Sequence, residues 1–252
     1  MKIVVIGGSG LIGKRLVQLL IEKDQLVIAA SPSRGVNAVT GEGLDAALQG
    51  ASVVVDVSNS PSFAEADVME FFVRSTTNLL AAEARAGVAH HVALSVVGAD
   101  RLKDSAYMRA KVAQEDLIQA SGIPYTIVRA TQFFEFLAAI GASGGEAESV
   151  HLPAAPMQPL AAADVSAALA EIALSPPRNA ILELAGPESL SIAEFIQRYF
   201  RAAGNPRTVI ADPDATYFGA ALNHQGLTPG PNAQISPTRF EDWATNHFAV
   251  RP

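Results

Sequence analysis

The chain opens with an apolar run that leads directly into a cluster of glycines. Residues Lys2–Ile6 are typical of a buried β-strand, and residues 14–20 are typical of an amphipathic helix. The stretch between them reads Gly7-Gly8-Ser9-Gly10-Leu11-Ile12-Gly13. A helix that begins at such a turn points unpaired backbone N–H groups and the positive end of its dipole at the turn. The pattern therefore predicts a site for the pyrophosphate of a dinucleotide.

The glycines of this run have different expected roles. Gly7 or Gly8 permits the tight turn from strand to helix, and Gly10 lets the backbone approach a phosphate with no side chain between them. Gly13 lets the helix lie close to the strand. The run fits both G-x-G-x-x-G from Gly8 and G-x-x-G-x-x-G from Gly7. We expect every residue from Gly7 to Gly13 to contribute to cofactor binding.

Composition limits the kind of protein that surrounds this turn. Of the 252 residues, 49% are hydrophobic and 17% are charged, which is typical of a compact α/β protein. The formal net charge of −7, without any cluster of Lys and Arg, argues against a nucleic-acid partner. The lack of cysteine excludes disulfides, thiolate metal ligands and cysteine nucleophiles. The histidines match no metal-ligand spacing, so we expect no metal.

The sequence shows no sign of export or of membrane insertion. A predicted strand begins at residue 2 or 3, which leaves no room for a signal peptide before it. Charges interrupt the longest apolar stretches, as Glu135 does between Phe134 and Phe136. We therefore expect a soluble, cytoplasmic protein without a membrane partner.

Strand-like and helix-like segments alternate along most of the chain, which predicts a parallel sheet wound on both faces. The predicted strands are 3–6, 26–30, 52–57, 91–95, 125–129 and 180–184. The predicted helices are 11–22, 64–86, 107–120, 162–174, 192–203 and about 238–248, and Ser191 is expected to cap the fifth. We expect His90 and His91, at the start of the strand 91–95, to be loop residues rather than metal ligands, and residues 141–148 to be mobile. A dinucleotide-binding domain of residues 1–185 would precede a small lobe of residues 186–252, with 130–160 contributing to the substrate side.

A second group of polar residues follows the predicted strand 91–95. Ser95 ends that strand, and Tyr107 and Lys111 come about one turn apart on one face of the next helix. An ammonium group beside a phenol lowers the pKa of the phenol, because it stabilises the phenolate. Tyr107 can then exchange a proton with a carbonyl or carbinol oxygen that the Ser95 hydroxyl also holds. These residues predict an active site at the carboxyl edge of the sheet.

Taken together, these motifs resemble the short-chain dehydrogenase/reductase superfamily, and most of all its atypical, NmrA-like branch of NAD(P)H-binding proteins. The similar segments are 7–13, 94–98, 107–111, 121–129, 161–165 and 185–188, which span most of the chain to about residue 200. The resemblance implies a Rossmann-type doubly wound sheet with a small C-terminal substrate lobe, a nicotinamide cofactor and hydride transfer. It implies that Tyr107 is the general acid, that Lys111 binds the nicotinamide ribose and tunes Tyr107, and that Ser95 orients the substrate carbonyl. Many members of the branch lack the tyrosine and serve as cofactor sensors.

The residues after the second predicted strand bear on the choice of cofactor. NAD sites usually carry an acidic residue there, whereas this chain has Ser31, Ser33 and Arg34. An arginine with two hydroxyls suits the 2′-phosphate of NADP. An ordinary Ser/Pro turn with an exposed arginine and no role in binding would have the same sequence pattern. We favour NADP(H) over NAD(H). We also expect Ser58, Asn59 and Ser60 beside the adenosine half, and Ala130, Thr131, Gln132 and Phe133 beside the nicotinamide.

Several other side chains have two interpretations. Phe133, Phe134 and Phe136 either line a pocket for an apolar substrate or belong to the core. Asp212-Pro213-Asp214 and Tyr217-Phe218 are candidates for the substrate lobe by their position alone. No G-x-S-x-G motif is present, which argues against a hydrolase.

Three functional hypotheses follow from these observations. The first is an NADP(H)-dependent oxidoreductase that transfers hydride between the nicotinamide and a carbonyl, quinone or hydroxyl substrate. The second is a catalytically silent NADP(H) sensor that signals through a protein partner. The third, a sugar-nucleotide epimerase or dehydratase, is disfavoured because the lobe is short and poor in Arg and Lys. The expected partner is a small-molecule substrate, and the sequence leaves monomer and homodimer both open.

Overall fold

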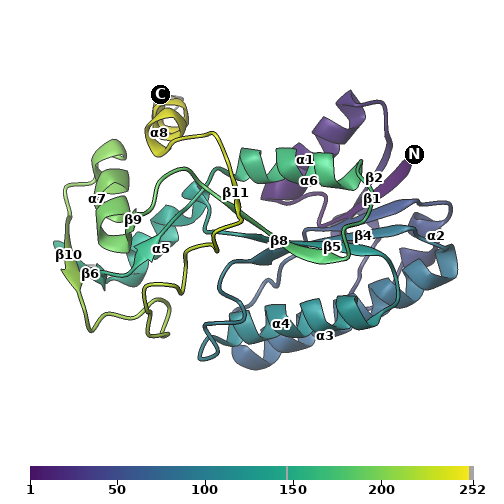
Figure 1. The fold of residues 1–252 in the computed structure, drawn as a ribbon, viewed down its shortest axis with the longest axis horizontal. Coiled ribbons are helices and arrows are strands. Elements are labelled where there is room, and N and C mark those ends of the chain that lie inside the picture. The colour runs from purple at the N-terminus through teal and green to yellow at the C-terminus, as the bar shows by residue number, and fades with distance from the viewer. Residues whose placement is uncertain (146, 250–252) are drawn as a thin grey trace.

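A computed structural model describes residues 1–145 and 147–249 and places a seven-stranded parallel sheet at the centre of the molecule (Figure 1). The order of its strands is β11-β8-β5-β4-β3-β1-β2. The strands are β1 (Lys2–Ile6), β2 (Leu26–Ala30), β3 (Val53–Asp56), β4 (His90–Val96), β5 (Tyr125–Ala130), β8 (Ala180–Ala185) and β11 (Gln234–Ile235). The helices are α1 (Leu11–Glu22), α2 (Leu44–Leu48), α3 (Glu65–Ala86), α4 (Ala106–Ala120), α5 (Leu137–Ser143), α6 (Ala162–Ala173), α7 (Ile192–Ala202) and α8 (Phe240–Ala249), with 3-10 turns at η1 (Pro32–Arg34) and η2 (Phe134–Phe136). The α/β architecture predicted from the sequence is confirmed.

Helices cover both faces of the sheet, as Figure 1 shows for α1 and α6 on one face and α3 and α4 on the other. Side chains alternate between faces along each strand. In β1, Ile3 and Val5 pack in one apolar cluster with residues of α1 and α6. Val4 and Ile6 pack in another with residues of α2 and α3. Both faces are therefore apolar, which explains why β1 reads as a continuous hydrophobic run.

The order of the strands places a crevice beside β1. The chain passes from β1 outward to β2 and then returns to form β3 on the other side of β1. At such a switch point the connections leave the sheet in opposite directions and open a crevice at the carboxyl ends of the strands. The glycine-rich turn after β1 and the polar residues after β3 lie at this crevice.

A third apolar cluster lies beyond one end of the sheet, where Figure 1 shows α5, α7 and α8 together. Its largest buried side chains include Phe134, Phe195, Phe200 and Phe240. Two further strand pairs join this region, the parallel pair β6 (Ser149–Pro153) with β10 (Thr208–Asp212) and the antiparallel pair β7 (Pro156–Met157) with β9 (Leu190–Ser191). The predicted cap of α7 is confirmed, because the Ser191 side chain accepts a hydrogen bond from the Glu194 N–H at 3.1 Å.

One local prediction is wrong. His90 and His91 belong to β4 and are buried, because the strand pairs with β3 and β5 from its first residues onward. His91 Nδ1 lies 2.8 Å from a carboxylate oxygen of the equally buried Glu83.

The expected mobility of residues 141–148 stays a prediction. Residues 141–143 form the end of α5, where the absence of a side chain on Gly141 lets the helix approach the Phe200 ring. Ser149 and the residues after it enter β6. Glu146, which also falls in this segment, lies outside the described residues.

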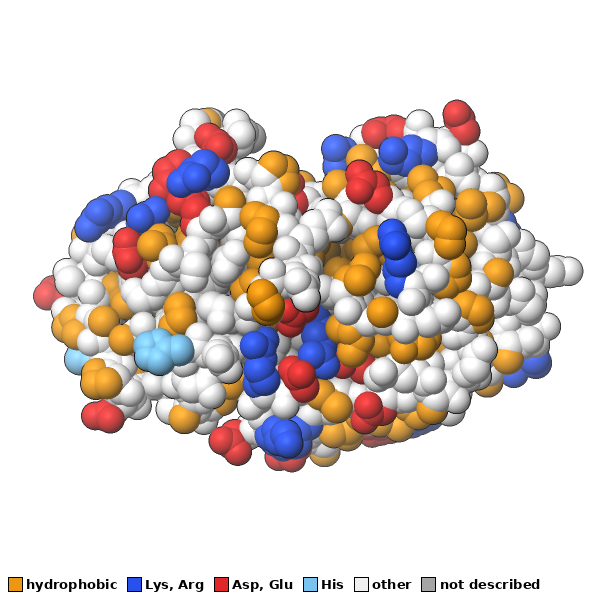
Figure 2. All heavy atoms as spheres, viewed as in Figure 1, with side chains coloured by type: hydrophobic (Ala, Val, Ile, Leu, Met, Phe, Trp, Pro, Cys, Tyr) orange, Lys and Arg blue, Asp and Glu red, His pale blue; other side chains and the backbone are white. Residues whose placement is uncertain are grey.

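The described part of the chain has no helix that is both long enough and apolar enough to cross a membrane. Within the same residues, no group of three or more His, Asp or Glu side chains is arranged to hold a metal ion. Figure 2 shows one face of the molecule, on which basic, acidic and hydrophobic side chains are interspersed and Lys and Arg form no continuous patch.

Candidate active site

The turn after β1 has the geometry that its glycines predict. Gly7 has a φ of +79°, and the N–H groups of Gly7 and Gly8 donate to the Ala30 carbonyl at 3.0 and 3.1 Å. A Cβ on Gly13 would lie 2.2 Å from the Gly7 carbonyl oxygen. The helix therefore packs directly on the turn, and only glycine leaves room for that packing.

The N-terminus of α1 is open toward the crevice. Gly10 precedes the helix, and no side chain caps the first N–H groups of α1. Uncapped N–H groups and the helix dipole together bind anions such as a pyrophosphate. The turn and the helix thus fit a dinucleotide on geometric grounds, since there is both room for the backbone to approach and a set of donors to meet the phosphates.

A cavity of about 1570 Å³ follows the carboxyl edge of the sheet. Pockets for a single small molecule are usually about 300–1,000 Å³, so this cavity has room for a dinucleotide and a substrate together. The predicted site residues that line it are Gly7, Ser9, Gly10, Leu11, Ile12, Ser31, Ser58, Asn59, Ser60, Ser95, Tyr107, Lys111, Ala130, Thr131, Gln132 and Phe133. The predicted residues outside its lining are Gly8, Gly13, Ser33 and Arg34, of which Gly8 and Gly13 shape the turn from behind.

Ser33 and Arg34 lie at the rim beyond the cavity wall. Both belong to the short turn η1, and both are exposed. The Ser33 hydroxyl is 3.0 Å from the hydroxyl of Ser31, which does line the cavity.

Tyr107 and Lys111 lie on α4, and both contact the ring of Phe72 on α3. The Lys111 ammonium is 4.3 Å from the centroid of that ring, and the ring of Tyr107 meets it edge to face at 5.9 Å. Lys111 Nζ donates to the Leu94 carbonyl at 2.9 Å and also to the side-chain oxygen of Gln114. The ammonium is thus fixed between β4 and α4.

Burial controls the ionisation of both groups. It raises the pKa of Tyr107 from 10.0 to about 12, so the phenol keeps its proton at neutral pH. This differs from the lowering expected from a neighbouring ammonium, because desolvation dominates around Tyr107 and Lys111 is occupied by other partners. Burial also lowers the pKa of Lys111 from 10.5 to about 8, against the opposing charges of Asp56 and Glu115.

A buried ammonium with a lowered pKa costs stability, and this predicts the effect of Lys111→Met. Below pH 8 Lys111 is charged in both the folded and the unfolded chain, so the folded state carries the full cost of burying the charge. That cost falls as the pH rises from about 8 to 10.5, because Lys111 then loses its proton in the folded chain but keeps it in the unfolded chain. After allowance for the lost hydrogen bonds, we expect Lys111→Met to raise Tm by about 5 °C at pH 7 and to flatten stability between pH 8 and 10.5. Thermal melts across pH 6–11 measure both effects. A lower Tm at pH 7 would contradict the prediction.

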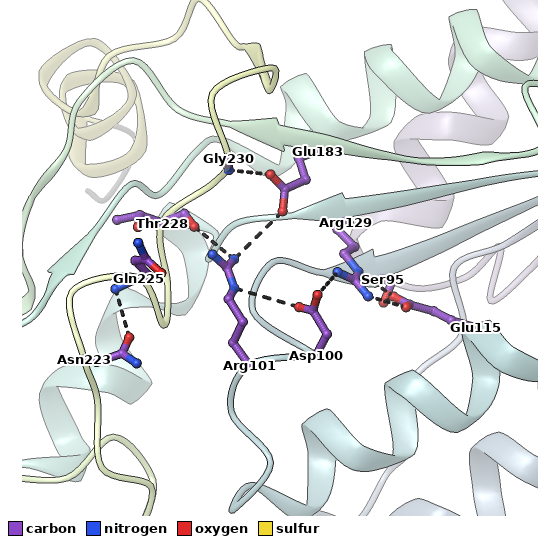
Figure 3. A network of polar contacts seen from close by, with 10 residues as sticks. All are labelled: Ser95, Asp100, Arg101, Glu115, Arg129, Glu183, Asn223, Gln225, Thr228 and Gly230. Carbon is purple, nitrogen blue, oxygen red and sulfur yellow. Dashed lines mark hydrogen bonds and ion pairs between the residues drawn. The ribbon is translucent and has the colours of Figure 1, made fainter.

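Ser95 is tied to a buried ion pair. Its hydroxyl lies 2.5 Å from a Glu115 carboxylate oxygen, and the Arg129 guanidinium binds both oxygens of Glu115 at 2.9 and 2.6 Å (Figure 3). A carboxylate paired with an arginine can only accept hydrogen bonds, so Ser95 donates its proton to Glu115. As arranged here, the Ser95 oxygen can accept a further hydrogen bond but has no proton left to donate.

The polar contacts continue from Arg129 to the C-terminal part of the chain, as Figure 3 shows. Arg129 contacts Asp100 at 3.0 Å, and Arg101 donates to the Thr228 carbonyl at 3.0 Å. Glu183 on β8 accepts a hydrogen bond from the Gly230 N–H and lies 3.9 Å from Arg101. The loop between β4 and α4 is thereby joined to residues 228–230.

Several residues of this site carry no signal in the sequence that would give them a role. Glu115 follows Lys111 by one helical turn, and Arg129 ends a predicted strand. No local sequence pattern predicts that Glu115 and Arg129 form an ion pair. Tyr217 is a candidate for the substrate lobe by its position alone, and it lines the cavity together with Phe218. Of the three phenylalanines with two interpretations, Phe134 is buried in the core, whereas Phe133 and Phe136 line the cavity. Asp212 pairs with His151 at 3.0 Å and is not part of the cavity wall.

A parallel α/β sheet with a glycine-rich turn at its switch point and a long cavity along its carboxyl edge defines a dinucleotide-binding protein of the Rossmann type. Residues 7–176 match the model of the NAD(P)H-binding family, and the chain belongs to this family.

Individual proteins are similar to this chain in sequence or in fold. The chain is 24% identical over 233 residues to the photosystem II assembly factor Ycf39 of Cyanophora paradoxa, across 85% of this chain and 73% of that protein. Its fold is similar to dTDP-4-dehydrorhamnose reductase of Bacillus anthracis in complex with NADP, with a TM-score of 0.77, 15% identity and 99% of each chain covered. It is also similar to the dTDP-glucose 4,6-dehydratase DesIV of Streptomyces venezuelae with NAD bound, with a TM-score of 0.74, 14% identity, and 99% and 96% of the two chains covered. These solved structures include both NADP and NAD complexes of nucleotide-sugar enzymes.

Proposed function

We propose that this protein is an NADP(H)-dependent oxidoreductase of the short-chain, NmrA-like type that acts on a carbonyl, quinone or hydroxyl compound. The observation that carries the proposal is that Tyr107 and Lys111 line the same cavity as the glycine-rich turn. A reduced nicotinamide bound beside these residues would supply a hydride to the substrate carbon, and the electron pair of the carbonyl π bond would move to the substrate oxygen. Tyr107 gives its proton to that oxygen, and solvent restores the proton to Tyr107.

Different residues of the chain bind different parts of the cofactor. The N–H groups of the turn and of α1 hold the pyrophosphate, Ser58, Asn59 and Ser60 lie along the adenosine half, and Lys111 holds the nicotinamide ribose. In this proposed division residues 1–185 hold the cofactor, residues 130–160 among them contribute to the substrate side, and the lobe of residues 186–252 completes it. The expected location in the cytoplasm stays a prediction.

The preference for NADP(H) rests on the residues after β2. An arginine and two hydroxyls can bind a 2′-phosphate, whereas the acidic residue usual in NAD sites would repel it. Arg34 is exposed at the rim beside Ser31, so its side chain is available to an extended cofactor at this end of the cavity.

This preference predicts the outcome of Arg34→Ala. Loss of a charge-assisted hydrogen bond costs about 1.5–3 kcal/mol, so the Kd for NADPH should rise about 10- to 100-fold while the Kd for NADH changes less than about 2-fold. Titration calorimetry with each cofactor measures the two constants. Arg85→Ala, an exposed arginine that pairs with Asp45 instead, is the matched control. An equal loss of affinity for both cofactors would exclude a specific contact with the 2′-phosphate.

The charges around the cavity favour an uncharged substrate. Of the described residues that line it, Glu65, Asp67, Glu70, Asp104 and Glu135 carry carboxylates, and Lys111 is the single cation. The uncapped N-terminus of α1 is available to the diphosphate of the cofactor, but among the described lining residues no arginine would compensate the repulsion between these carboxylates and a second diphosphate on the substrate. An epimerase or dehydratase reaction on a nucleotide sugar is therefore the less favoured alternative.

A panel of aldehydes, ketones and quinones, each tested for substrate-dependent oxidation of NADPH, examines the proposed reaction. Turnover of at least one compound supports it. Tight NADPH binding with no turnover of any compound would instead favour the cofactor sensor. The contacts of Lys111 with Leu94 and Gln114, rather than with Tyr107, are the observation in favour of that second function.

A further inference from the structure

A second tyrosine faces the cavity from the C-terminal part of the chain. Tyr217 lines the cavity with Tyr107 and is only 9% exposed. It is a buried member of the same apolar cluster against which Tyr107 packs. Neither phenol hydroxyl makes a hydrogen bond to another described residue. Neither hydroxyl is fully enclosed by the protein either, so each has some accessible surface. Both hydroxyls are therefore available to a bound molecule.

A tight turn holds Tyr217 in place. Tyr217 and Ala220 exchange two backbone hydrogen bonds of 2.8 and 3.0 Å, and the turn between them contains Phe218 at a φ of +47° and Gly219 at +84°. A positive φ is costly for a bulky residue such as phenylalanine and persists only where the surroundings impose it. The Phe218 ring lies on the Phe136 ring at 5.8 Å, so the turn directs Phe218 to the rim and Tyr217 inward.

The segment that follows the turn packs against the loop between β4 and α4. Gly98 and Gly226 approach so closely that a Cβ on Gly98 would lie 1.9 Å from the Gly226 carbonyl oxygen. Arg101 and Glu183 bind the backbone of residues 228–230, as Figure 3 shows. Arg129, which holds Glu115 and thereby Ser95, contacts Asp100 in the same loop. One polar network thus positions both the Ser95 hydroxyl and the C-terminal segment that follows Tyr217.

Because Ser95 has no proton to donate, the substrate oxygen lacks a second hydrogen-bond donor. A carbonyl oxygen that gains negative charge during reduction is best stabilised by two donors. Tyr107 supplies one of them, but the proton of Ser95 is directed to Glu115. We propose that Tyr217 is a catalytic residue of this protein and donates the second hydrogen bond to the substrate oxygen beside Tyr107. This inference rests on the proposed reduction and names a residue of the same site.

The two tyrosines would have different roles. Burial, together with the neighbouring Tyr107, raises the pKa of Tyr217 above its usual value, so Tyr217 keeps its proton throughout. Tyr107 transfers its proton to the oxygen, while Tyr217 only shares one. The Ser95 oxygen, which can still accept, suits an N–H or O–H donor instead of the carbonyl.

The variant Tyr217→Phe tests the inference, since it removes the hydroxyl and keeps the ring. Loss of one donor to a developing oxyanion typically lowers kcat about 10²- to 10³-fold. We expect a loss of that size for the best substrate of the panel, with the Kd for NADPH and the Tm unchanged. Tyr199→Phe, on α7 and outside the cavity wall, is the matched control and should retain full activity.

A binding experiment separates this inference from the proposed reaction. The probe is 4-nitrophenol, titrated with pH in the presence of the protein and NADP⁺, because two phenol donors around its oxygen lower its pKa and the change is seen in its absorbance. Tyr217→Phe should abolish a large part of that shift. If the wild type reduces nothing but shows the Tyr217-dependent shift, the donor site stands and the reaction fails. If Tyr217→Phe matches the wild type in turnover and in the probe's pKa, or if the wild type shows neither property, the inference is overturned.

Discussion

Tyr107→Phe is expected to lower NADPH-dependent reduction by about 10²- to 10⁴-fold, the usual contribution of a general acid. The substitution removes the hydroxyl that we expect to transfer its proton to the substrate oxygen during the reduction. The phenol ring packs on Phe63 and Phe72, and phenylalanine preserves both contacts. The fold should therefore survive, and the loss should fall on kcat rather than on the Kd for NADPH. Steady-state kinetics with the best substrate of the panel measure it.

Two comparisons make this result specific. Tyr199→Phe removes a phenol hydroxyl from α7 and should leave kcat unchanged. The double variant Tyr107→Phe/Tyr217→Phe should be little worse than Tyr107→Phe alone, since groups that act as a unit are not additive. Activity of Tyr107→Phe within about 3-fold of the wild type would remove Tyr107 from the mechanism, given that the proton transfer alone is worth about 10².

Gly13→Ala is expected to damage cofactor binding and folding together. Its new Cβ would meet the Gly7 carbonyl oxygen at 2.2 Å and the Gly8 Cα at 2.7 Å, and both are backbone atoms. The turn and α1 must then separate, at a cost of about 1–3 kcal/mol. We expect Tm to fall by about 3–10 °C and the Kd for NADPH to rise about 10- to 100-fold. Thermal melts and cofactor titration measure the two effects.

Gly10→Ala is the matched control within the same turn. The nearest atom to its new Cβ is again the Gly7 carbonyl oxygen, but at 3.3 Å, so a small adjustment accommodates it. Its Tm should stay within about 3 °C of the wild type, while the Cβ still hinders the approach of a phosphate and weakens NADPH. Wild-type NADPH affinity in Gly13→Ala would show that the close packing of α1 on the turn is not needed for binding.

The regular elements were predictable because their signals are local. The predicted bounds 11–22 and 26–30 agree with α1 and β2, where apolar periodicity and flanking polar residues mark both ends. The glycine-rich turn was predictable for the same reason. Burial on both faces gives the strands of a parallel sheet continuous apolar runs, which a single sequence displays directly.

The contacts that complete the site were not predictable, because their partners are distant in the sequence. Arg101 and Thr228 are separated by 127 positions, and Glu183 and Gly230 by 47. Neither pair follows a spacing that a helix or a strand would impose. The histidines of β4 illustrate the same limit, since a pair of polar residues suggests a loop until one ring nitrogen of His90 is seen to contact Thr126 and one of His91 to contact Glu83.

The two-residue strand β11 has a consequence for association between molecules. It pairs with β8 through Gln234 and Ile235 and forms the outer edge of the central sheet. Long, flat edges invite a strand from another molecule to add to the sheet, and short edges offer few free backbone groups for this. The chain follows β11 with Ser236, whose N–H is bonded to Ala185, and then with Pro237, which has no N–H to offer. This end of the sheet is thereby protected against edge-to-edge aggregation.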